Sequence, residues 1–159
     1  MYIFPPNPQW KIDYAREVER IQWVFSVALS FSHIGSTAID GLYAKDCIDI
    51  MGVTDNLKLI RRYRSQLEAI GYVYKGAYGI EGREYFSKPL RKVHLHLYEK
   101  GDANIDKQLK FLRLMQDKPA LVHEFNVLKQ QFHEQFPDNK AAYQAAKTSF
   151  YLRLQSMDE

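Results

Sequence analysis

The sequence has a single cysteine and no long hydrophobic run. Cys47 stands alone among 159 residues, which excludes an internal disulfide framework and a zinc site built from cysteines alone. Free cysteine commonly packs as a small hydrophobic side chain, so Cys47 is expected to be buried and inert. No stretch is apolar over the length that spans a bilayer. These absences predict a cytoplasmic protein with no membrane partner.

An excess of charge of one sign is also missing. The chain has 22 Lys and Arg against 19 Asp and Glu, a formal net charge of +3. This balance does not predict binding to duplex nucleic acid, but it leaves a small anionic ligand open. The 11 Tyr and 9 Phe are better explained by packing than by base stacking.

Apolar spacing predicts the elements of the first part of the chain. An amphipathic helix is expected over residues 11–30, where apolar side chains recur every three or four positions. Short apolar runs predict strands at 31–34 and 47–54. Asp55 is placed to cap a following helix, which Gly71 would end.

The second part changes from a strand pattern to a helix pattern. Residues 72–98 read as strands, and their last segment alternates so that His94 and His96 share the face opposite Val93 and Leu95. After Gly101 the pattern is helical. Three helices are expected, over residues 104–116, 119–135 and 139–155, with Pro119 in a first turn and Asp138 as the cap of the last helix.

These elements together predict an α/β fold of the α+β kind. One sheet with helices packed on it is expected over residues 1–101, and a helical segment over 102–159 packs on that core. With 46% hydrophobic residues, the chain is long enough to bury a continuous core. A single domain over residues 1–159 is therefore predicted.

The turn Gly35-Ser36-Thr37 is a candidate binding site for an anion. Glycine lets the backbone approach a ligand closely, and the two hydroxyl groups can donate hydrogen bonds. The tripeptide follows a short predicted strand, and a helix start after it would add free N–H groups. A plain turn with a helix cap explains the same residues.

Asp49 is the most informative single residue, because it lies inside an apolar predicted strand. Burying a carboxylate is costly unless it is paired, bound to a metal or placed at an open end of the sheet. An ion pair with Lys45 or an arginine is the structural alternative to a functional role. Asp46 is expected in a loop or on the face of the strand opposite Asp49.

His94 and His96 could act with Asp49 if their strands are neighbours. Two imidazoles and one carboxylate would then form a set suited to a transition metal. Histidines held by hydrogen bonds without a metal are the alternative. Arg83 supplies positive charge nearby, whereas Lys129 and Lys147 lie on later predicted helices, where solvated surface positions are expected.

Residues 33–50, HIGSTAIDGLYAKDCIDI, resemble the signature of the GrpB family, in which the stretch runs close to HIGSTAVPGLxAKPxIDI. The likeness extends from about Phe31 to near the end of the chain. It continues through Arg83, the His94–His96 strand, Leu128-Lys129, and Tyr143 with Lys147.

The resemblance implies a nucleotidyltransferase-like fold with a mixed sheet flanked by helices. In that fold a Gly-Ser loop holds nucleotide phosphates, and a strand with two acids binds magnesium. Gly35 and Ser36 match the loop, and Asp49 matches one acid. The second acid would fall at Cys47 or Met51, and neither binds magnesium.

The first functional expectation is a nucleotidyltransferase-like protein that binds a nucleotide or another phosphorylated small molecule. The candidate catalytic residues are Asp49, His94 and His96. The candidate phosphate-binding residues are His33, Gly35, Ser36, Thr37, Lys45 and Arg83. Asp49 would hold a divalent cation, magnesium or manganese. Two alternatives stay open: a catalytically silent ligand-sensing or protein-interaction module, and a transition-metal site of Asp49, His94 and His96.

Overall fold

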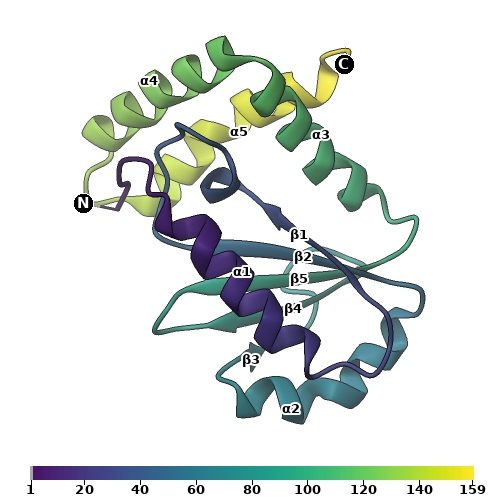
Figure 1. Ribbon diagram of the computed structural model, residues 1–159. Coiled ribbons are helices and arrows are strands. Elements are labelled where there is room, and N and C mark those ends of the chain that lie inside the picture. Colours follow the sequence, from purple (N-terminus) through teal and green to yellow (C-terminus); the bar gives the residue numbers. More distant parts are fainter. Residues whose placement is uncertain (1) are drawn as a thin grey trace.

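Five strands form one mixed sheet in the computed structural model, which describes residues 2–159 (Figure 1). The strand order is β1-β2-β5-β4-β3. Their bounds are β1 Ser30–Ile34, β2 Ile48–Thr54, β3 Val73–Tyr74, β4 Arg83–Lys88 and β5 Val93–Glu99. Strands β2 and β5 pair in parallel, and the other pairs are antiparallel. The predicted sheet with helices packed on it is therefore confirmed.

The central pair of strands decides which side chains meet on each face. Asp49 in β2 lies opposite His94 in β5. Because side chains alternate along a strand, Ile48 and Ile50 point to one face and Asp49 to the other. Ile48, Ile50, Val93, Leu95 and Leu97 are all buried. The predicted division of the β5 residues between the two faces is confirmed.

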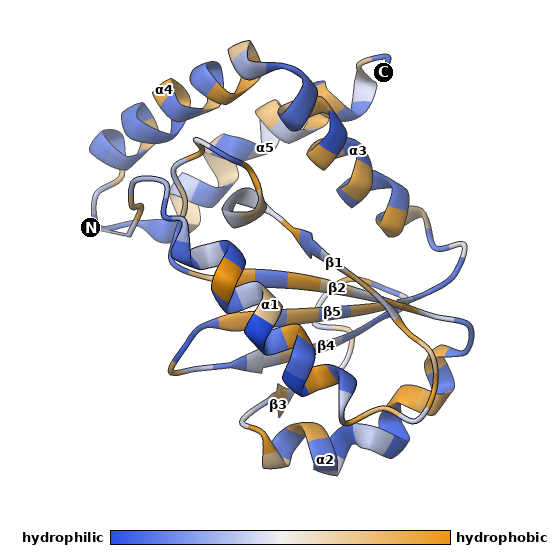
Figure 2. Ribbon diagram, viewed as in Figure 1, coloured by the Kyte–Doolittle hydropathy of each residue, from blue (hydrophilic) through white to orange (hydrophobic). Residues whose placement is uncertain are grey.

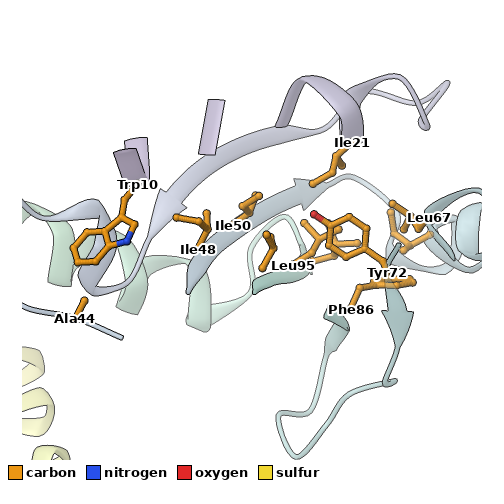
Figure 3. Close-up of a cluster of buried hydrophobic side chains, with 12 residues drawn as sticks. Trp10, Ile21, Ala44, Ile48, Ile50, Leu67, Tyr72, Phe86 and Leu95 are labelled. Atoms are coloured by element: carbon orange, nitrogen blue, oxygen red, sulfur yellow. The ribbon is translucent and has the colours of Figure 1, made fainter. Parts of the chain in front are cut away.

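Helix α1 (Gln9–Gln22) covers the apolar face of the sheet. Figure 3 shows Trp10 and Ile21 of this helix beside Ile48, Ile50 and Leu95. The prediction of a helix over residues 11–30 is wrong beyond Gln22. Residues 23–29 leave the helix, yet Val24, Phe25 and Leu29 of this segment still pack on the core. The helical spacing of apolar residues therefore extends beyond the end of the helix itself.

The segment after β2 is helical but not one α-helix. A 3₁₀ helix, η2 (Leu57–Tyr63), leads directly into the short helix α2 (Arg64–Ala69). Asn56 caps the segment in place of Asp55, because its Oδ1 accepts a hydrogen bond from the Lys58 N–H at 3.1 Å. Gly71 follows α2 with φ of +104°, in the conformation that commonly ends a helix.

Three helices follow the sheet, each within one residue of its predicted bounds. They are α3 (Ala103–Asp117), α4 (Pro119–Gln135) and α5 (Lys140–Ser156). Asn139 caps α5 in place of Asp138, since its Oδ1 accepts from the Ala142 N–H at 3.0 Å. Figure 2 shows hydrophobic and hydrophilic residues alternating along α3, as in an amphipathic helix.

The three helices pack on the polar side of the sheet. Ile105 and Leu109 of α3 contact a buried group made of Ile34, Met51 and Tyr98. A separate apolar cluster joins α3, α4 and α5 to Ile39 and Leu42, which follow β1. Within residues 2–159, no helix has the length and hydrophobicity needed to cross a membrane.

Candidate functional site

The turn after β1 lies directly against Asp49. Gly35 has φ of +74°, a left-handed conformation that favours glycine. A Cβ atom at this position would lie 2.9 Å from Asp49 Oδ2. Glycine is therefore required here both by the backbone conformation and by the close approach to the carboxylate.

Asp49 pairs with the two histidines and not with Lys45. Its Oδ1 lies 3.0 Å from His96 Nε2 and 3.4 Å from His94 Nδ1. Burial raises the pKa of Asp49, but the hydrogen bonds with His94 and His96 outweigh this effect and hold the pKa below its usual range. The structure thus brings these three side chains together, as expected if their strands are neighbours.

The contact with Arg83 determines the tautomer of His96. Its Nη1 lies 3.1 Å from His96 Nδ1, and a guanidinium group only donates hydrogen bonds. His96 Nδ1 must therefore accept, so the ring proton is on Nε2 and is donated to Asp49. Arg83 itself is buried, donates to the carbonyl oxygens of Ala77 and Tyr78, and acts behind the site.

His33 also lies behind the residues that line the site. Its Nε2 is 3.0 Å from Thr37 Oγ1, and its ring stacks on Tyr14 with centroids 4.7 Å apart. Burial lowers the pKa of His33 to about 4, so the ring is neutral at neutral pH. His33 thus holds the turn in place and carries no charge toward a ligand.

A cavity of about 250 Å³ separates the turn and the sheet from helices α4 and α5. Its walls include the predicted residues Gly35, Ser36, Thr37, Lys45, Asp49 and His94, together with Cys47, Lys129, Tyr143, Gln144, Lys147 and Tyr151. A second cavity of about 360 Å³ shares Gly35, Asp49 and Tyr151 with the first and reaches His96 and Phe111. We call the two cavities, which share these lining residues, the cleft.

Three lysines, Lys45, Lys129 and Lys147, line the first cavity of the cleft. Lys129 is 1% exposed and Lys147 is 5% exposed, so the prediction of solvated surface positions is wrong for both. Lys129 Nζ donates to Ser36 Oγ at 2.8 Å and to the Tyr43 carbonyl oxygen at 2.6 Å. Lys147 Nζ lies 4.7 Å from the centre of the Tyr143 ring.

Burial makes these ammonium groups costly. It lowers the pKa of Lys147 to about 7, and repulsion from Lys45 adds to the effect. Burial, with repulsion from Lys147 and Lys45, lowers the pKa of Lys129 well below its ordinary value. Burial also lowers the pKa of Lys45.

The sequence held a signal for the two buried lysines. Lys129 follows Leu121 and Phe125 at intervals of four, and Lys147 lies between Tyr143 and Leu154 on the buried side of α5. A lysine in an apolar helical stripe predicts a buried ammonium group.

Tyr143 adds an unused polar group to the cleft. Its Oη is buried and has no hydrogen-bond partner among the residues that the structure describes. A buried hydroxyl group without a partner is unfavourable, and such groups are rare in folded proteins. Tyr143 therefore has a buried hydroxyl group without a partner among the described residues, in a side chain that lines the cleft.

Cys47 borders the cleft beside Asp49 and is only half-buried. The predicted burial of Cys47 is therefore met only in part, because the residue borders the cleft. Burial raises the pKa of its thiol to about 12. One ligand atom each from Cys47, Asp49 and His94 lie within 4.8 Å of one another.

These donors do not fit the paired magnesium ions of nucleotidyl transfer. Magnesium prefers oxygen ligands, and two such ions need several carboxylates. Among the described residues that line the cleft, Asp49 alone has a carboxylate. No reaction step through magnesium can be built on this set.

The arrangement of sheet and helices is that of the nucleotidyltransferase-like proteins. The Cid1 poly(U) polymerase, solved with bound MgATP, superposes with a TM-score of 0.59 at 8% sequence identity, covering 85% of this chain and 46% of that one. This likeness shows the fold alone.

The chain belongs to the GrpB family, because its residues 1–156 match the family described as GrpB protein. The crystal structure of GrpB from Enterococcus faecalis superposes with a TM-score of 0.90 at 25% identity, covering 96% of this chain and 94% of that one. UPF0157 protein YqkA of Bacillus subtilis is 35% identical over 140 residues, which is 86% of this chain. The chain spans 41% of the length of YqkA.

Proposed function

We propose that this chain binds a nucleotide or another phosphorylated small molecule in the cleft. The observation that carries the proposal is the convergence of Lys45, Lys129 and Lys147 on the Gly35-Ser36-Thr37 turn. Lys147 and Lys45 both repel the ammonium group of Lys129. Burial disfavours the charged form of a lysine unless a counter-charge lies beside it. An anionic ligand supplies it.

Several features favour a phosphate group over a singly charged anion. A phosphate carries enough charge and enough acceptor oxygens to engage more than one lysine at once. Gly35 lets the backbone come close, and Ser36 and Thr37 add hydroxyl groups. Tyr143 Oη supplies a buried donor that has no other partner among the described residues.

The second cavity gives room for the organic part of the ligand. It extends from Asp49 toward Phe111, Tyr151 and the aliphatic Ile34. Ligand sites are commonly apolar with a few fixed polar groups, and a base or sugar suits such a wall. Cid1 structures have been solved with MgATP and with the UTP analogue UMPNPP, which supports a nucleotide in the same type of fold.

The alternative is a ligand-sensing module without turnover, and the lone carboxylate of Asp49 favours it. In a catalytic version Asp49, His94 and His96 would be the catalytic residues. Release of pyrophosphate from nucleoside triphosphates by the wild type, lost in Asp49→Asn, would support catalysis. Binding without pyrophosphate release would support the sensing module.

Tyr143→Phe tests the binding proposal most sharply. The variant removes only the unpartnered hydroxyl group, so the unliganded protein should keep its stability or gain some. A hydrogen bond to a charged oxygen contributes about 1.5–3 kcal/mol, so affinity for tripolyphosphate or ATP should fall about 10- to 100-fold by isothermal titration calorimetry.

Tyr72→Phe is the matched control. Tyr72 Oη donates to Glu17 at 2.7 Å on the apolar side of the sheet. Its loss should destabilise the protein and leave phosphate affinity unchanged. Equal affinities of wild type and Tyr143→Phe, or binding of an unphosphorylated nucleoside as tight as that of its triphosphate, would contradict the proposal.

A further inference from the structure

We propose that Cys47, Asp49 and His94 bind one divalent transition metal ion, zinc above all, at the edge of the cleft. These residues supply a thiolate, a carboxylate and an imidazole, the three ligand types that zinc takes in proteins. The proposal shares Asp49 with the phosphate cleft but does not rest on it, because metal binding can be measured without any phosphate.

The distances suit a single ion. Bonds of about 2.0–2.3 Å to a tetrahedral zinc place its ligand atoms about 3.3–3.7 Å apart. Asp49 Oδ1 and His94 Nδ1 are 3.4 Å apart. The ligand atoms of all three residues lie within 4.8 Å of one another, so closure of the site needs a movement of about 1 Å. Cys47 Sγ has only a 4.0 Å contact with the Ile48 carbonyl oxygen to give up.

His96 supports this site and does not belong to its ligands. Its Nδ1 accepts from Arg83 at 3.1 Å, and its Nε2 proton goes to Asp49 Oδ1. Both ring nitrogens are therefore engaged. A histidine that orients a ligating carboxylate is a typical support around a metal. The set is thus Cys47, Asp49 and His94, and not the two histidines with Asp49 that the sequence suggested.

The charge of the three ligands suits a divalent ion, and their chemistry favours zinc over magnesium. A thiolate, a carboxylate and a neutral imidazole together cancel the charge of a divalent ion, so the loaded site next to Lys45 and Lys147 has no net charge. Thiolate and imidazole are ligands for zinc, cobalt or iron, whereas magnesium is bound through oxygen. Three protein ligands leave a fourth position for water or a ligand oxygen.

Cobalt(II) gives a direct readout of the thiolate. Cys47 is the only cysteine in the sequence, so a near-ultraviolet thiolate-to-cobalt charge-transfer band in the full chain can come only from this residue. We expect the band at one cobalt per chain, its disappearance on addition of one equivalent of zinc, and its absence in Cys47→Ser. Magnesium should leave the band unchanged.

Competition with a chromophoric chelator measures zinc affinity in the variants. Changes in groups that support a metal ligand cost about 10- to 100-fold. Cys47→Ser, Asp49→Asn and His94→Ala should each lose more than this, whereas His96→Gln should fall within that range and keep the cobalt band. His123→Ala, at an exposed position of α4, is the matched control and should match the wild type.

The outcomes separate this proposal from the phosphate proposal. No cobalt band in the wild type, or a zinc affinity of Cys47→Ser equal to that of the wild type, would overturn the metal site. A zinc affinity that is kept in Cys47→Ser but lost in His96→Gln would point to the other ligand set. Tripolyphosphate binding is measured separately on chelator-treated protein, and its result tests the phosphate proposal alone.

Discussion

Replacing Lys147 with methionine should stabilise the free protein and at the same time abolish phosphate binding. Burial lowers the pKa of Lys147 from 10.5 to about 7. One pKa unit corresponds to about 1.4 kcal/mol, so protonated Lys147 costs the folded state about 4–5 kcal/mol below pH 7. Its contact with the Tyr143 ring offsets about 1 kcal/mol. Lys147→Met should therefore gain about 3–4 kcal/mol at pH 6.

The gain should shrink at higher pH. Between pH 7 and 10.5 the unfolded chain binds the proton of Lys147 more tightly than the folded protein does, so the stability of the wild type rises with pH in this window. At pH 9 the remaining cost is about 2 kcal/mol. Urea unfolding of both proteins at pH 6 and pH 9, in phosphate-free buffer, measures the two differences in free energy of unfolding.

Ligand binding should remove most of the difference in stability at pH 6. Tripolyphosphate at about 100 times its dissociation constant should raise the unfolding free energy of the wild type by about 2.7 kcal/mol and leave Lys147→Met unchanged. Lys118→Met, at an exposed position between α3 and α4, should behave as the wild type throughout. The reasoning is refuted if Lys147→Met is no more stable than the wild type at pH 6, or if it still binds tripolyphosphate.

Two further predictions concern the turn that borders the cleft. Gly35→Ala places a Cβ atom 2.9 Å from Asp49 Oδ2 at a φ of +74°, and should lower the unfolding free energy by about 1–3 kcal/mol; a loss below about 0.5 kcal/mol in urea would contradict the described turn. Burial lowers the pKa of His33 to about 4, so below pH 6.5 the unfolded chain binds a proton at His33 more tightly than the folded protein does. The free energy of unfolding should therefore fall by about 2–3 kcal/mol as the pH decreases from 6.5 toward 4. His33→Gln should flatten this part of the stability curve, while His123→Gln should not.

Elements with a strong local pattern could be predicted from the sequence. Helices α3, α4 and α5 have regular apolar spacing, and the alternation in β5 fixes which face His94 and His96 occupy. The end of α1 at Gln22 could not be predicted, because apolar residues at the same spacing continue in a non-helical segment. Spacing reports burial, and only the backbone decides whether a helix produces it.

The residues of the site could be predicted from the sequence only in part. Asp49, His94 and the turn at Gly35 were identifiable from residue type and family likeness, but their contact depends on β5 pairing with β2 across some forty residues of chain. Strand order is set by tertiary packing and not by local pattern. Lys129 and Lys147 were missed because a lysine on a helix is normally a surface residue.

The lysines of the cleft come from different parts of the chain, and this has a consequence for how the protein holds together. Lys129 and Lys147 belong to the helices after residue 101, whereas Ser36 and Lys45 belong to the segment before it. A bound anion would contact both segments at once and neutralise the repulsion among the lysines. Binding would therefore stabilise the packing of the helices after residue 101 on the segment before it. Protection of α4 and α5 amides from hydrogen exchange would then report occupancy of the cleft.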